Sequence, residues 1–400
     1  MKAKVILHIV FDSVLFDKVY PRFEEMDGYE NRYLYKGIHF DKSWFKYIKN
    51  SDKIICADTL QEWGAVISDP SNDIIYFHAL WKDSLKAVDY IRKDVVVMWW
   101  CFGYEIYENE YGWAPLLPLN VYKPRTFIFL LRHSKRIRSL LSKSITWTFP
   151  KFYDALQSIR YSIQGKRILH KQLLSRIDFA FTPLPIELDE LKKRHPYIKA
   201  KPFILRASSS QWPFEYQEIK SGVLFEHSAM LNNNHLDLLA ATKKLHFQGR
   251  EVYVPLSYGD KEVADYMIKH ASFGGAETHF LTEVLSGEDY RELLKKCSHA
   301  LFGTIRQSGL GNVNILLRRG VKMFFFEDSI MYKHLKREGY YVFSIEKDLN
   351  DESISTPLTY EMALHNYNLF YQKIEVLCKT YQQQFDSLLS SIRYDDQRRS

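Results

Sequence analysis

Residues 299–314 read HALFGTIRQSGLGNVN and combine an apolar run, a loop with two glycines and the start of a helical pattern. The apolar run predicts a buried β-strand, and the helical pattern ends at Gly320, a residue type favoured just after a helix. Glycines one residue apart at a strand-to-helix junction let backbone N–H groups approach an anion. The stretch therefore predicts a βα unit whose loop binds a negatively charged group.

The same alternation extends through the C-terminal half of the chain. Apolar runs alternate with helical patterns and occupy residues 222–228, 251–259, 278–285, 299–305, 321–326 and 340–344. Strands that alternate with helices form βαβ units and a parallel sheet covered on both faces. Residues 222–350 are therefore predicted to form a Rossmann-like α/β domain.

The N-terminal half has a similar but less regular pattern. Strand candidates occupy residues 4–11, 53–58, 73–80, 95–102 and 178–183. Because 400 residues exceed the size at which one core keeps growing, we expect a second Rossmann-like domain over residues 1–205 and a turn-rich linker over 206–221. A helical pattern over 355–400 predicts a C-terminal tail that crosses between both domains.

Composition excludes several classes of protein. The four cysteines form no CxxC pair and no Cys/His ligand spacing, which indicates buried thiols in a reducing compartment. The sequence contains no run of 18 apolar residues, so no membrane-spanning helix is predicted. The short N-terminal apolar run ends at Asp12, which favours a strand over a signal peptide.

The glycine loop differs from a dinucleotide-binding fingerprint. Asn314 stands where the third glycine of that fingerprint would be, and the loop follows a late strand instead of the first. This disfavours an NAD-dependent enzyme, while a tight turn that only needs positive φ remains an alternative. Arg306 and Gln307 suit a diphosphate, and Glu327 at the end of the next strand suits ribose or sugar hydroxyls.

The order of these loops resembles the donor domain of glycosyltransferase family 56. The similarity rests on FEHSAMLNNNHLDLL, VYVPLSYGD, DYRELLKKCSHALF and IRQSGLGNVNILLRRGVKMFFFED, and weaker matches are LHIVFDS, IYFHALW and WWCFGYEIY. The resemblance implies a GT-B glycosyltransferase with the acceptor domain first. It also implies a nucleoside-diphosphate sugar donor, such as an amino-deoxyhexose or fucose-like sugar, and a polyprenyl-diphosphate-linked saccharide acceptor in bacterial surface polysaccharide synthesis.

The resemblance also implies donor-binding residues. The sequence departs from the family pattern at His227, where asparagine is expected, and at Ser308, which replaces a glutamine. A lone histidine such as His235 is alternatively a cap or core group. The predicted donor-binding set is His227, Ser228, Asn233, His235, Tyr258, Arg306, Gln307, Ser308, Gly309, Gly311, Asn312 and Glu327.

Glycosyl transfer places negative charge on the departing diphosphate, and a cationic, N–H-rich pocket stabilises it without a metal or cofactor. The predicted donor domain contains no DxD motif, so we expect metal-independent transfer. A general base must take the proton of the acceptor hydroxyl if the configuration inverts. The candidates are Glu105, Asp12 and His78, each near the end of a predicted strand.

Residues 123–176 carry 13 Lys or Arg against one acid, a net charge of +12, which leaves 7 − 12 = −5 for the rest of the chain. The pattern predicts a basic amphipathic helix whose apolar face includes Leu130, and the basic candidates for an anionic membrane surface are Arg132, Lys135, Arg136 and Lys143. An ordinary packed helix is the alternative; nucleic-acid binding lacks a supporting motif.

The sequence thus predicts a peripheral glycosyltransferase at the cytoplasmic face of the inner membrane. The alternative is a non-catalytic sugar-nucleotide-binding or membrane-surface scaffold of the same fold.

Overall fold

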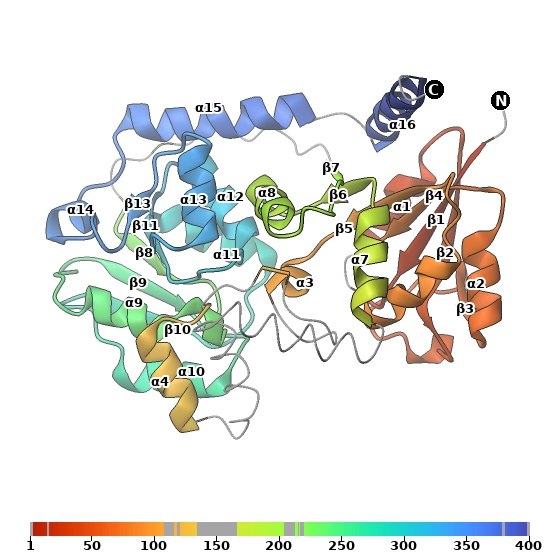
Figure 1. Cartoon of the computed structure of the whole chain (residues 1–400). Coiled ribbons are helices and arrows are strands. Elements are labelled where there is room, and N and C mark those ends of the chain that lie inside the picture. Colours follow the sequence, from red (N-terminus) through yellow and green to blue (C-terminus); the bar gives the residue numbers. More distant parts are fainter. Residues whose placement is uncertain are drawn as a thin grey trace. The chain divides into compact units, whose positions relative to one another are not determined.

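The computed structural model describes residues 3–13, 16–107, 116–117, 121–133, 166–203, 213–214, 216, 220–377 and 381–397. The chain divides into two compact units, each built on one parallel sheet with helices around it (Figure 1). Unit 1 contains Met1–Pro118, Phe149–Ser209 and Val376–Ser400, and unit 2 contains Leu119–Thr148 and Ser210–Glu375. The prediction of two Rossmann-like α/β domains is confirmed.

Unit 1 has a seven-stranded sheet in the order β3-β2-β1-β4-β5-β6-β7. Its strands are β1 (Lys4–Val10), β2 (Tyr29–Ile38), β3 (Ile54–Ala57), β4 (Asn72–Phe77), β5 (Val96–Trp100), β6 (Phe179–Phe181) and β7 (Lys201–Pro202). Its α-helices are α1 (Phe16–Glu24), α2 (Leu60–Ser68), α3 (Gly103–Tyr107), α7 (Lys166–Arg176), α8 (Pro185–Arg194) and α16 (Tyr381–Gln397), with 3-10 turns η1 (Lys42–Trp44) and η2 (Lys82–Asp89). The strand order reverses between β1 and β4.

Strand β2 was not predicted from the sequence, although it pairs in parallel with both β1 and β3. Its sequence, YENRYLYKGI, contains charged residues among its aromatic ones, so it lacks the continuous apolar run of a buried strand. The charges are accommodated because the first half of β2 is partly exposed, and Arg32 pairs there with Glu30 at 2.6 Å.

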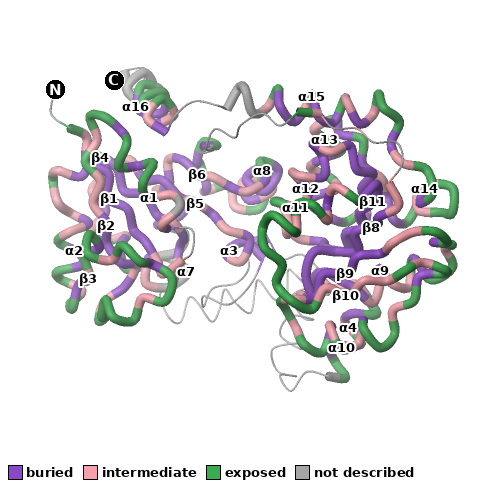
Figure 2. Tube along the Cα trace, turned by 180° about the vertical axis from the view of Figure 1, so that it is seen from behind, coloured by how far each residue is buried: buried purple, intermediate pink, exposed green. Residues whose placement is uncertain are grey.

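The core of unit 1 includes part of the C-terminal tail. Phe385 on α16 is fully buried in one cluster with Ile6, Tyr76 and Met98 from three strands. Tyr29 in turn donates a 2.6 Å hydrogen bond to the Asp386 carboxylate. Figure 2 shows that buried residues concentrate along the strands, while exposed residues lie on the outer helices and loops.

Unit 2 has a six-stranded parallel sheet in the order β10-β9-β8-β11-β12-β13. Its strands are β8 (Gly222–Phe225), β9 (Glu251–Pro255), β10 (Glu277–Leu281), β11 (Cys297–Phe302), β12 (Lys322–Phe325) and β13 (Phe343–Ser344). Its helices are α4 (Pro124–His133), η3 (Leu231–Asn233), α9 (His235–Thr242), α10 (Lys261–His270), α11 (Gly287–Lys296), α12 (Leu310–Arg318), α13 (Ile330–Arg337), α14 (Asp351–Ser355) and α15 (Tyr360–Leu377). The strand order reverses between β8 and β11, so the loops after these two strands diverge and leave room for a ligand.

The first described helix of the basic segment, α4, packs on unit 2, although the sequence analysis placed the whole segment in the N-terminal domain. The Asp237 carboxylate accepts hydrogen bonds from Arg125 N and Thr126 N at the start of α4, at 2.9 and 2.8 Å. Phe129 joins the unit 2 core, and Asn234 accepts a hydrogen bond from Lys123 N. The segment therefore contributes to both units, because α7 belongs to unit 1.

Helix α12 ends at Arg318 with Arg319 as its C-cap, and Gly320 follows directly, as predicted for a glycine just after a helix, in the left-handed region at φ +65°. A Cβ added there would lie 2.5 Å from Ala363 Cβ on α15, so the absent side chain also permits close helix packing. Gly249, in the loop before β9, has a similar φ of +76° but no atom within 4 Å of an added Cβ. Substitutions at the two glycines therefore distinguish the cost of backbone strain, which both share, from the cost of a steric clash, which arises only at Gly320.

We expect Gly320→Ala to lower the free energy of unfolding of unit 2 more than Gly249→Ala. Both variants place alanine in the left-handed region, which costs roughly 1–2 kcal/mol. Only Gly320→Ala adds a clash, for about 1–3 kcal/mol more. Urea denaturation followed by far-ultraviolet circular dichroism measures both, and equal losses would contradict the close approach of α15.

Candidate active site

Most of the predicted donor-binding residues lie at the carboxyl edge of the unit 2 sheet. The loop after β8 contributes His227, Ser228 and Asn233, and the loop after β11 contributes residues 306–309. Because β8 and β11 are neighbours at the reversal of strand order, these loops flank the position where parallel α/β sheets bind ligands.

A buried carboxylate that the sequence analysis missed joins the two loops. Glu226 follows β8 directly, has φ +63°, and is fully buried. Its Oε1 accepts hydrogen bonds from Gly303 N and Thr304 N in the loop after β11, and its Oε2 lies 2.8 Å from His227 Nδ1. The available sequence signal for Glu226 was an acid between an apolar strand and a histidine. Its backbone partners Gly303 and Thr304 lie 77 and 78 residues further along the chain, so the sequence did not reveal the contact.

The two departures from the family pattern contact each other. His227 Nε2 lies 3.1 Å from Ser308 Oγ, so Glu226, His227 and Ser308 form one hydrogen-bonded chain. The imidazole also packs on Gly309, where an added Cβ would lie 2.9 Å from His227 Nδ1. Gly309 is in the left-handed region at φ +63°, so a glycine is required there by both backbone and space.

The remaining predicted residues after β8, namely Ser228, Asn233 and His235, are buried. Asn233 donates from Nδ2 to Ser228 O and Ser228 Oγ, both at 3.0 Å. Its Oδ1 and both ring nitrogens of His235 have no hydrogen-bond partner within the described part of the chain. Burial lowers the pKa of His235 to about 3, so the ring is neutral. Within this set, Asn233 therefore fixes the loop after β8 through its two bonds to Ser228.

Arg306 is held in a fixed position at the mouth of the loop after β11. When the Asn232 amide is oriented with its oxygen toward the guanidinium, Asn232 Oδ1 accepts from Arg306 Nε at 2.7 Å and from Arg306 Nη2 at 2.8 Å. Arg306 Nη1 also donates to Gln307 O at 3.2 Å. The sequence analysis did not select Asn232, although it lies in the same polar run as Asn233.

The start of α12 offers backbone N–H groups beside this arginine. Gly309 is the N-cap, and the N–H groups of the first helical turn have no carbonyl partner within the helix. Gly311 lies in this turn with no atom within 4 Å of an added Cβ. Asn312 turns instead toward α11, where its Nδ2 donates to Tyr290 Oη at 3.0 Å. The open side of the turn is therefore at Gly311.

The loop after β9 joins the same edge. Ala229 N donates to Tyr258 O at 2.9 Å, and Asp260 N donates to Ala229 O at 3.0 Å. The Asp260 carboxylate accepts from Leu231 N at 2.9 Å. The Tyr258 side chain itself is 57% exposed. Three polar loops thus converge, as the sequence analysis predicted.

Glu327 follows β12 and is bound to other side chains of unit 2. Its Oε1 lies 2.6 Å from Lys347 Nζ, and its N–H donates to Glu346 Oε2 at 3.0 Å. Among the described residues, the cluster of potential metal ligands is Glu251, Glu277 and His279. Glu251 and Glu277 begin β9 and β10, so this cluster lies at the opposite, amino-terminal edge of the sheet.

In unit 1, two of the three candidate bases are bonded to backbone N–H groups. Asp12 accepts from Lys46 N at 2.8 Å and from Tyr47 N and Ile48 N at 3.0 Å, which holds the loop after η1. Glu105 is fully buried, and its carboxylate accepts three hydrogen bonds, from Leu80 N, Trp99 Nε1 and Phe102 N, at 2.6, 2.9 and 2.6 Å. Burial raises the pKa of Glu105 to about 8, while the three N–H donors oppose that shift.

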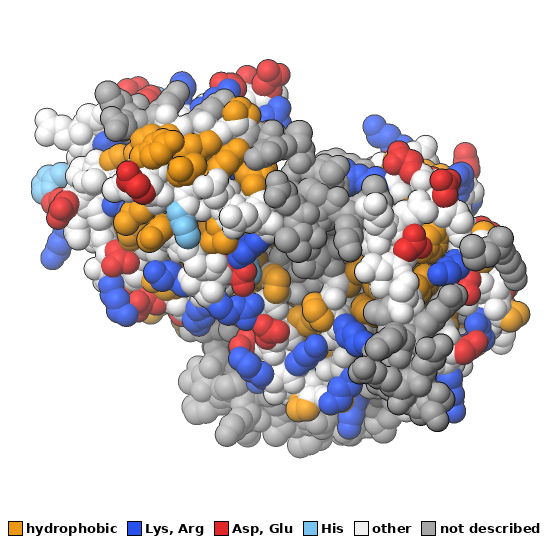
Figure 3. Space-filling view, turned by 90° about the horizontal axis from the view of Figure 1, so that it is seen from above, with side chains coloured by type: hydrophobic (Ala, Val, Ile, Leu, Met, Phe, Trp, Pro, Cys, Tyr) orange, Lys and Arg blue, Asp and Glu red, His pale blue; other side chains and the backbone are white. Residues whose placement is uncertain are grey.

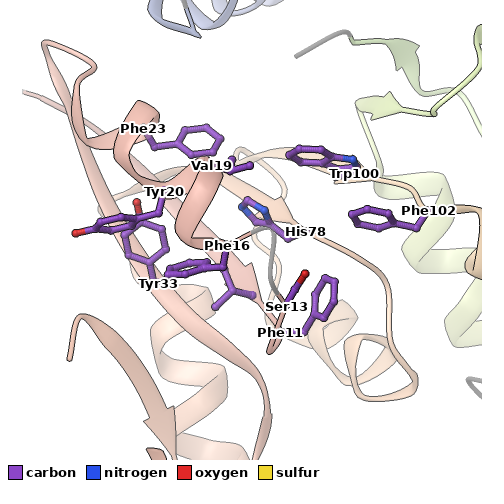
Figure 4. A pocket seen from close by; sticks show the side chains of 11 residues that line it. Phe11, Ser13, Phe16, Val19, Tyr20, Phe23, Tyr33, His78, Trp100 and Phe102 are labelled. Carbon is purple, nitrogen blue, oxygen red and sulfur yellow. The ribbon is translucent and has the colours of Figure 1, made fainter. Parts of the chain in front are cut away.

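His78, the third candidate, lines a pocket at the carboxyl edge of the unit 1 sheet. The pocket lies where the strand order reverses between β1 and β4. In Figure 4, His78 lies between aromatic side chains of α1 and β2 on one side and Trp100 and Phe102 on the other. The rings of Trp100 and Phe102 stack at 5.8 Å. The pocket lining is Val10, Phe11, Ser13, Phe16, Val19, Tyr20, Phe23, Tyr33, His78, Trp100 and Phe102.

Comparison with solved structures supports the fold over the whole chain. The N-terminal domain of a Candida albicans trehalose-6-phosphate phosphatase covers 98% of this chain and 97% of its own at 10% identity and a TM-score of 0.50. A trehalose-6-phosphate protein from E. coli bound with UDP-2-fluoro glucose covers 97% and 98% at 9% identity and a TM-score of 0.50. The lipopolysaccharide outer core galactosyltransferase WaaB, in its apo form, covers 98% and 99% at 9% identity and a TM-score of 0.48. No curated protein matches the chain.

The sequence itself identifies the family. The profile described as "4-alpha-L-fucosyltransferase glycosyl transferase group 56" matches residues 187–393, which is just over half of the chain and includes all of the unit 2 sheet. The two Rossmann-like units agree with the GT-B architecture that the resemblance implied. The chain therefore belongs to glycosyltransferase family 56 and is a hexosyltransferase-type glycosyltransferase with a GT-B fold.

Proposed function

We propose that this glycosyltransferase moves a sugar from a nucleoside-diphosphate donor held by unit 2 to a polyprenyl-diphosphate-linked saccharide. The observation that carries the donor assignment is the open first turn of α12 beside the fixed guanidinium of Arg306. Unpaired N–H groups, a helix N-terminus and a cation are the groups that bind a diphosphate. The donor sugar is of the amino-deoxyhexose or fucose-like class that the family resemblance implies.

The same groups stabilise the reaction as it proceeds. When the bond from the anomeric carbon to the diphosphate breaks, negative charge grows on the leaving oxygen, and fixed donors lower the barrier. The acids around this edge are bonded to protein groups: Glu226 to backbone N–H groups, Asp260 to Leu231 N and Glu327 to Lys347. We therefore propose transfer without a metal ion or other cofactor.

We propose His78 as the general base. Asp12 and Glu105 each accept three N–H hydrogen bonds, which suits a structural role. His78 lines the aromatic pocket of unit 1. Aromatic side chains pack well against the apolar faces of sugars and against a hydrocarbon chain, so the pocket suits a lipid-linked saccharide.

The membrane surface is the site proposed for the acceptor. On α4, Ile128 and Leu131 are 47% and 42% exposed, and Arg132 is exposed beside them, which suits an anionic bilayer. Leu130, predicted on the apolar face of this helix, is buried, at 5% exposed. Lys135, Arg136 and Lys143 lie outside the described residues. On the face shown in Figure 3, acidic and basic side chains of the described residues are mixed.

Membrane attachment would be peripheral in this proposal, at the cytoplasmic face of the inner membrane. Over the described residues, no helix combines the length and the apolar character needed to cross a bilayer.

Gly311→Ala tests the donor site. A methyl group there meets no protein atom, so we expect a normally stable protein whose affinity for nucleoside diphosphates and their sugars falls about 10-fold or more. The matched control is Gly287→Ala in the first turn of α11, where the nearest atom to an added Cβ is Arg291 Nη1 at 3.6 Å. Calorimetric titration with thymidine and uridine diphosphates measures both variants. Unchanged affinity in Gly311→Ala would reject this donor site, and binding without sugar transfer would favour a non-catalytic scaffold.

Glu105→Gln and Asp12→Asn test the structural role of these acids. Each amide turns an NH₂ group toward backbone donors, so each variant should lose about 1–3 kcal/mol of unfolding free energy. The control Asp52→Asn alters an exposed acid and should change stability by less than about 0.5 kcal/mol.

His78→Ala should lower kcat by about 100-fold or more. Lost turnover with unchanged stability in either acid variant would instead identify that acid as the base.

Neutralising Arg132, Lys135, Arg136 and Lys143 should abolish flotation of the protein with liposomes that contain anionic lipids. The control neutralises four exposed basic residues elsewhere on unit 2: Lys243, Lys244, Lys269 and Arg291. An equal loss in both variants would mean that total charge, and not this segment, drives binding.

A further inference from the structure

A chain of hydrogen bonds runs from the aromatic pocket of unit 1 into its core. His78 Nε2 lies 2.9 Å from Nδ1 of His8 on β1. His8 Nε2 lies 3.0 Å from Asn31 Oδ1 on β2, and Asn31 Nδ2 donates to Phe23 O at 2.8 Å. His8 is fully buried, and neither His8 nor Asn31 was a predicted site residue.

The polarity of this chain follows from its inner end. Phe23 O only accepts, so the Asn31 amide must present NH₂ to it and its carbonyl oxygen to His8. His8 Nε2 therefore carries the proton, and in a neutral imidazole Nδ1 is then the acceptor. His78 must donate to that atom from Nε2, which leaves His78 Nδ1 without a proton. A bare ring nitrogen is the form that a general base requires.

Both rings are neutral in this environment. Burial lowers the pKa of His8 to about 4 and that of His78 well below its ordinary value. The carboxylate that acts on His8 is Glu24, and it is bonded to Tyr33 Oη at 3.0 Å and to Lys53 Nζ at 2.6 Å. The His8 ring also stacks on Tyr33 at 4.9 Å and meets Phe23 edge-on at 4.4 Å. These contacts restrict rotation of the ring.

We propose that His8 and Asn31 are positioning residues that hold His78 as its Nε2–H tautomer, so that Nδ1 takes the proton of the acceptor hydroxyl during glycosyl transfer. The inference rests on the proposed role of His78 as the base. The acceptor oxygen forms a bond to the anomeric carbon, and the bond from that carbon to the diphosphate oxygen breaks with its electron pair. The hydroxyl proton passes to His78 Nδ1, and the imidazolium still donates from Nε2 to His8.

Asn31→Asp tests the polarity of the chain with almost no change in volume. When the new acid is ionised, a carboxylate beside His8 favours a second proton on that ring, which then donates from Nδ1. A protonated acid would donate to Phe23 O as the Asn31 amide does and leave the chain unchanged, so kcat and the tautomer are measured over a pH series that reaches the ionised form. His78 must accept at Nε2 and carry its own proton on Nδ1. We expect the tautomer of His78 to invert and kcat to fall on the order of 10- to 100-fold, with KM for the donor unchanged.

His8→Phe tests the same link by another route. Phenylalanine keeps an aromatic ring against Tyr33 and Phe23 but removes both hydrogen bonds, so kcat should fall by a similar factor. His8→Asn is the conservative variant, because its Oδ1 occupies the place of Nδ1 and accepts from His78. It should recover part of the lost kcat. Urea denaturation of each full-length variant checks that unit 1 stays folded.

The direct readout is the tautomer of His78 in ¹⁵N-histidine-labelled protein, from long-range ¹H–¹⁵N spectra assigned with His78→Ala. Wild-type His78 in the Nε2–H form, inverted in Asn31→Asp together with the fall in kcat, is the expected result. A wild-type Nδ1–H form, or unchanged kcat in both Asn31→Asp and His8→Phe, would overturn the inference. Full turnover in His78→Ala would reject His78 as the general base. This outcome therefore separates failure of the proposed function from failure of the positioning role of His8 and Asn31.

Discussion

The buried carboxylate of Glu226 is the interaction on which the arrangement of unit 2 depends. It lies where the strand order reverses, and it satisfies two N–H groups after β11 while it also bonds to the histidine after β8. A buried charge is tolerated only when such partners compensate its lost hydration. The loops after β8 and β11 are therefore tied together, and Arg306, Ser308 and Gly309 take their places from this contact.

In unit 1, too, buried hydrogen-bonding groups lie where the strand order reverses, but their chemistry differs. Its reversal between β1 and β4 also forms a site, but aromatic rings line it and a histidine chain replaces the carboxylate. A neutral chain of donors and acceptors costs less to bury than a charge, and its direction is set by one carbonyl group at its inner end. In the proposed function, the two units supply complementary environments, one for an anion and one for an apolar or sugar-like surface.

The departures of this chain from the family pattern also gain a physical meaning. His227 and Ser308 are 81 residues apart but form one hydrogen bond, so a change at one position alters what the other can bond to. Gly309 packs beneath the His227 ring, which links the histidine to the backbone that begins α12. The pair joins the loops after β8 and β11 next to the proposed diphosphate site, where small changes in bonding alter ligand contacts.

Much of the fold was predictable from the sequence because it rests on local signals. Apolar runs, helical periodicity and glycines at turns are properties of short segments. They identified all six strands of unit 2, the glycine that follows α12 and the convergence of the loops. The family itself was evident from the order of those loops. The signal failed for β2, whose charged residues hide a central strand, and for α4, whose partners Asn234 and Asp237 are more than 100 residues away.

The roles of the polar residues were decided by tertiary structure. Asp12, Glu105 and His78 looked equivalent as polar groups near strand ends, yet two are bonded to backbone N–H groups and one lines a pocket. Glu226, Asn232 and His8 lie within segments that carry the family resemblance, but neither these residues nor Asn31 were predicted as site residues. A sequence determines which donors and acceptors a chain carries, but a hydrogen bond requires two of them within about 3 Å in a defined direction. Only the folded chain brings together partners from distant strands and so determines which groups remain available for a substrate.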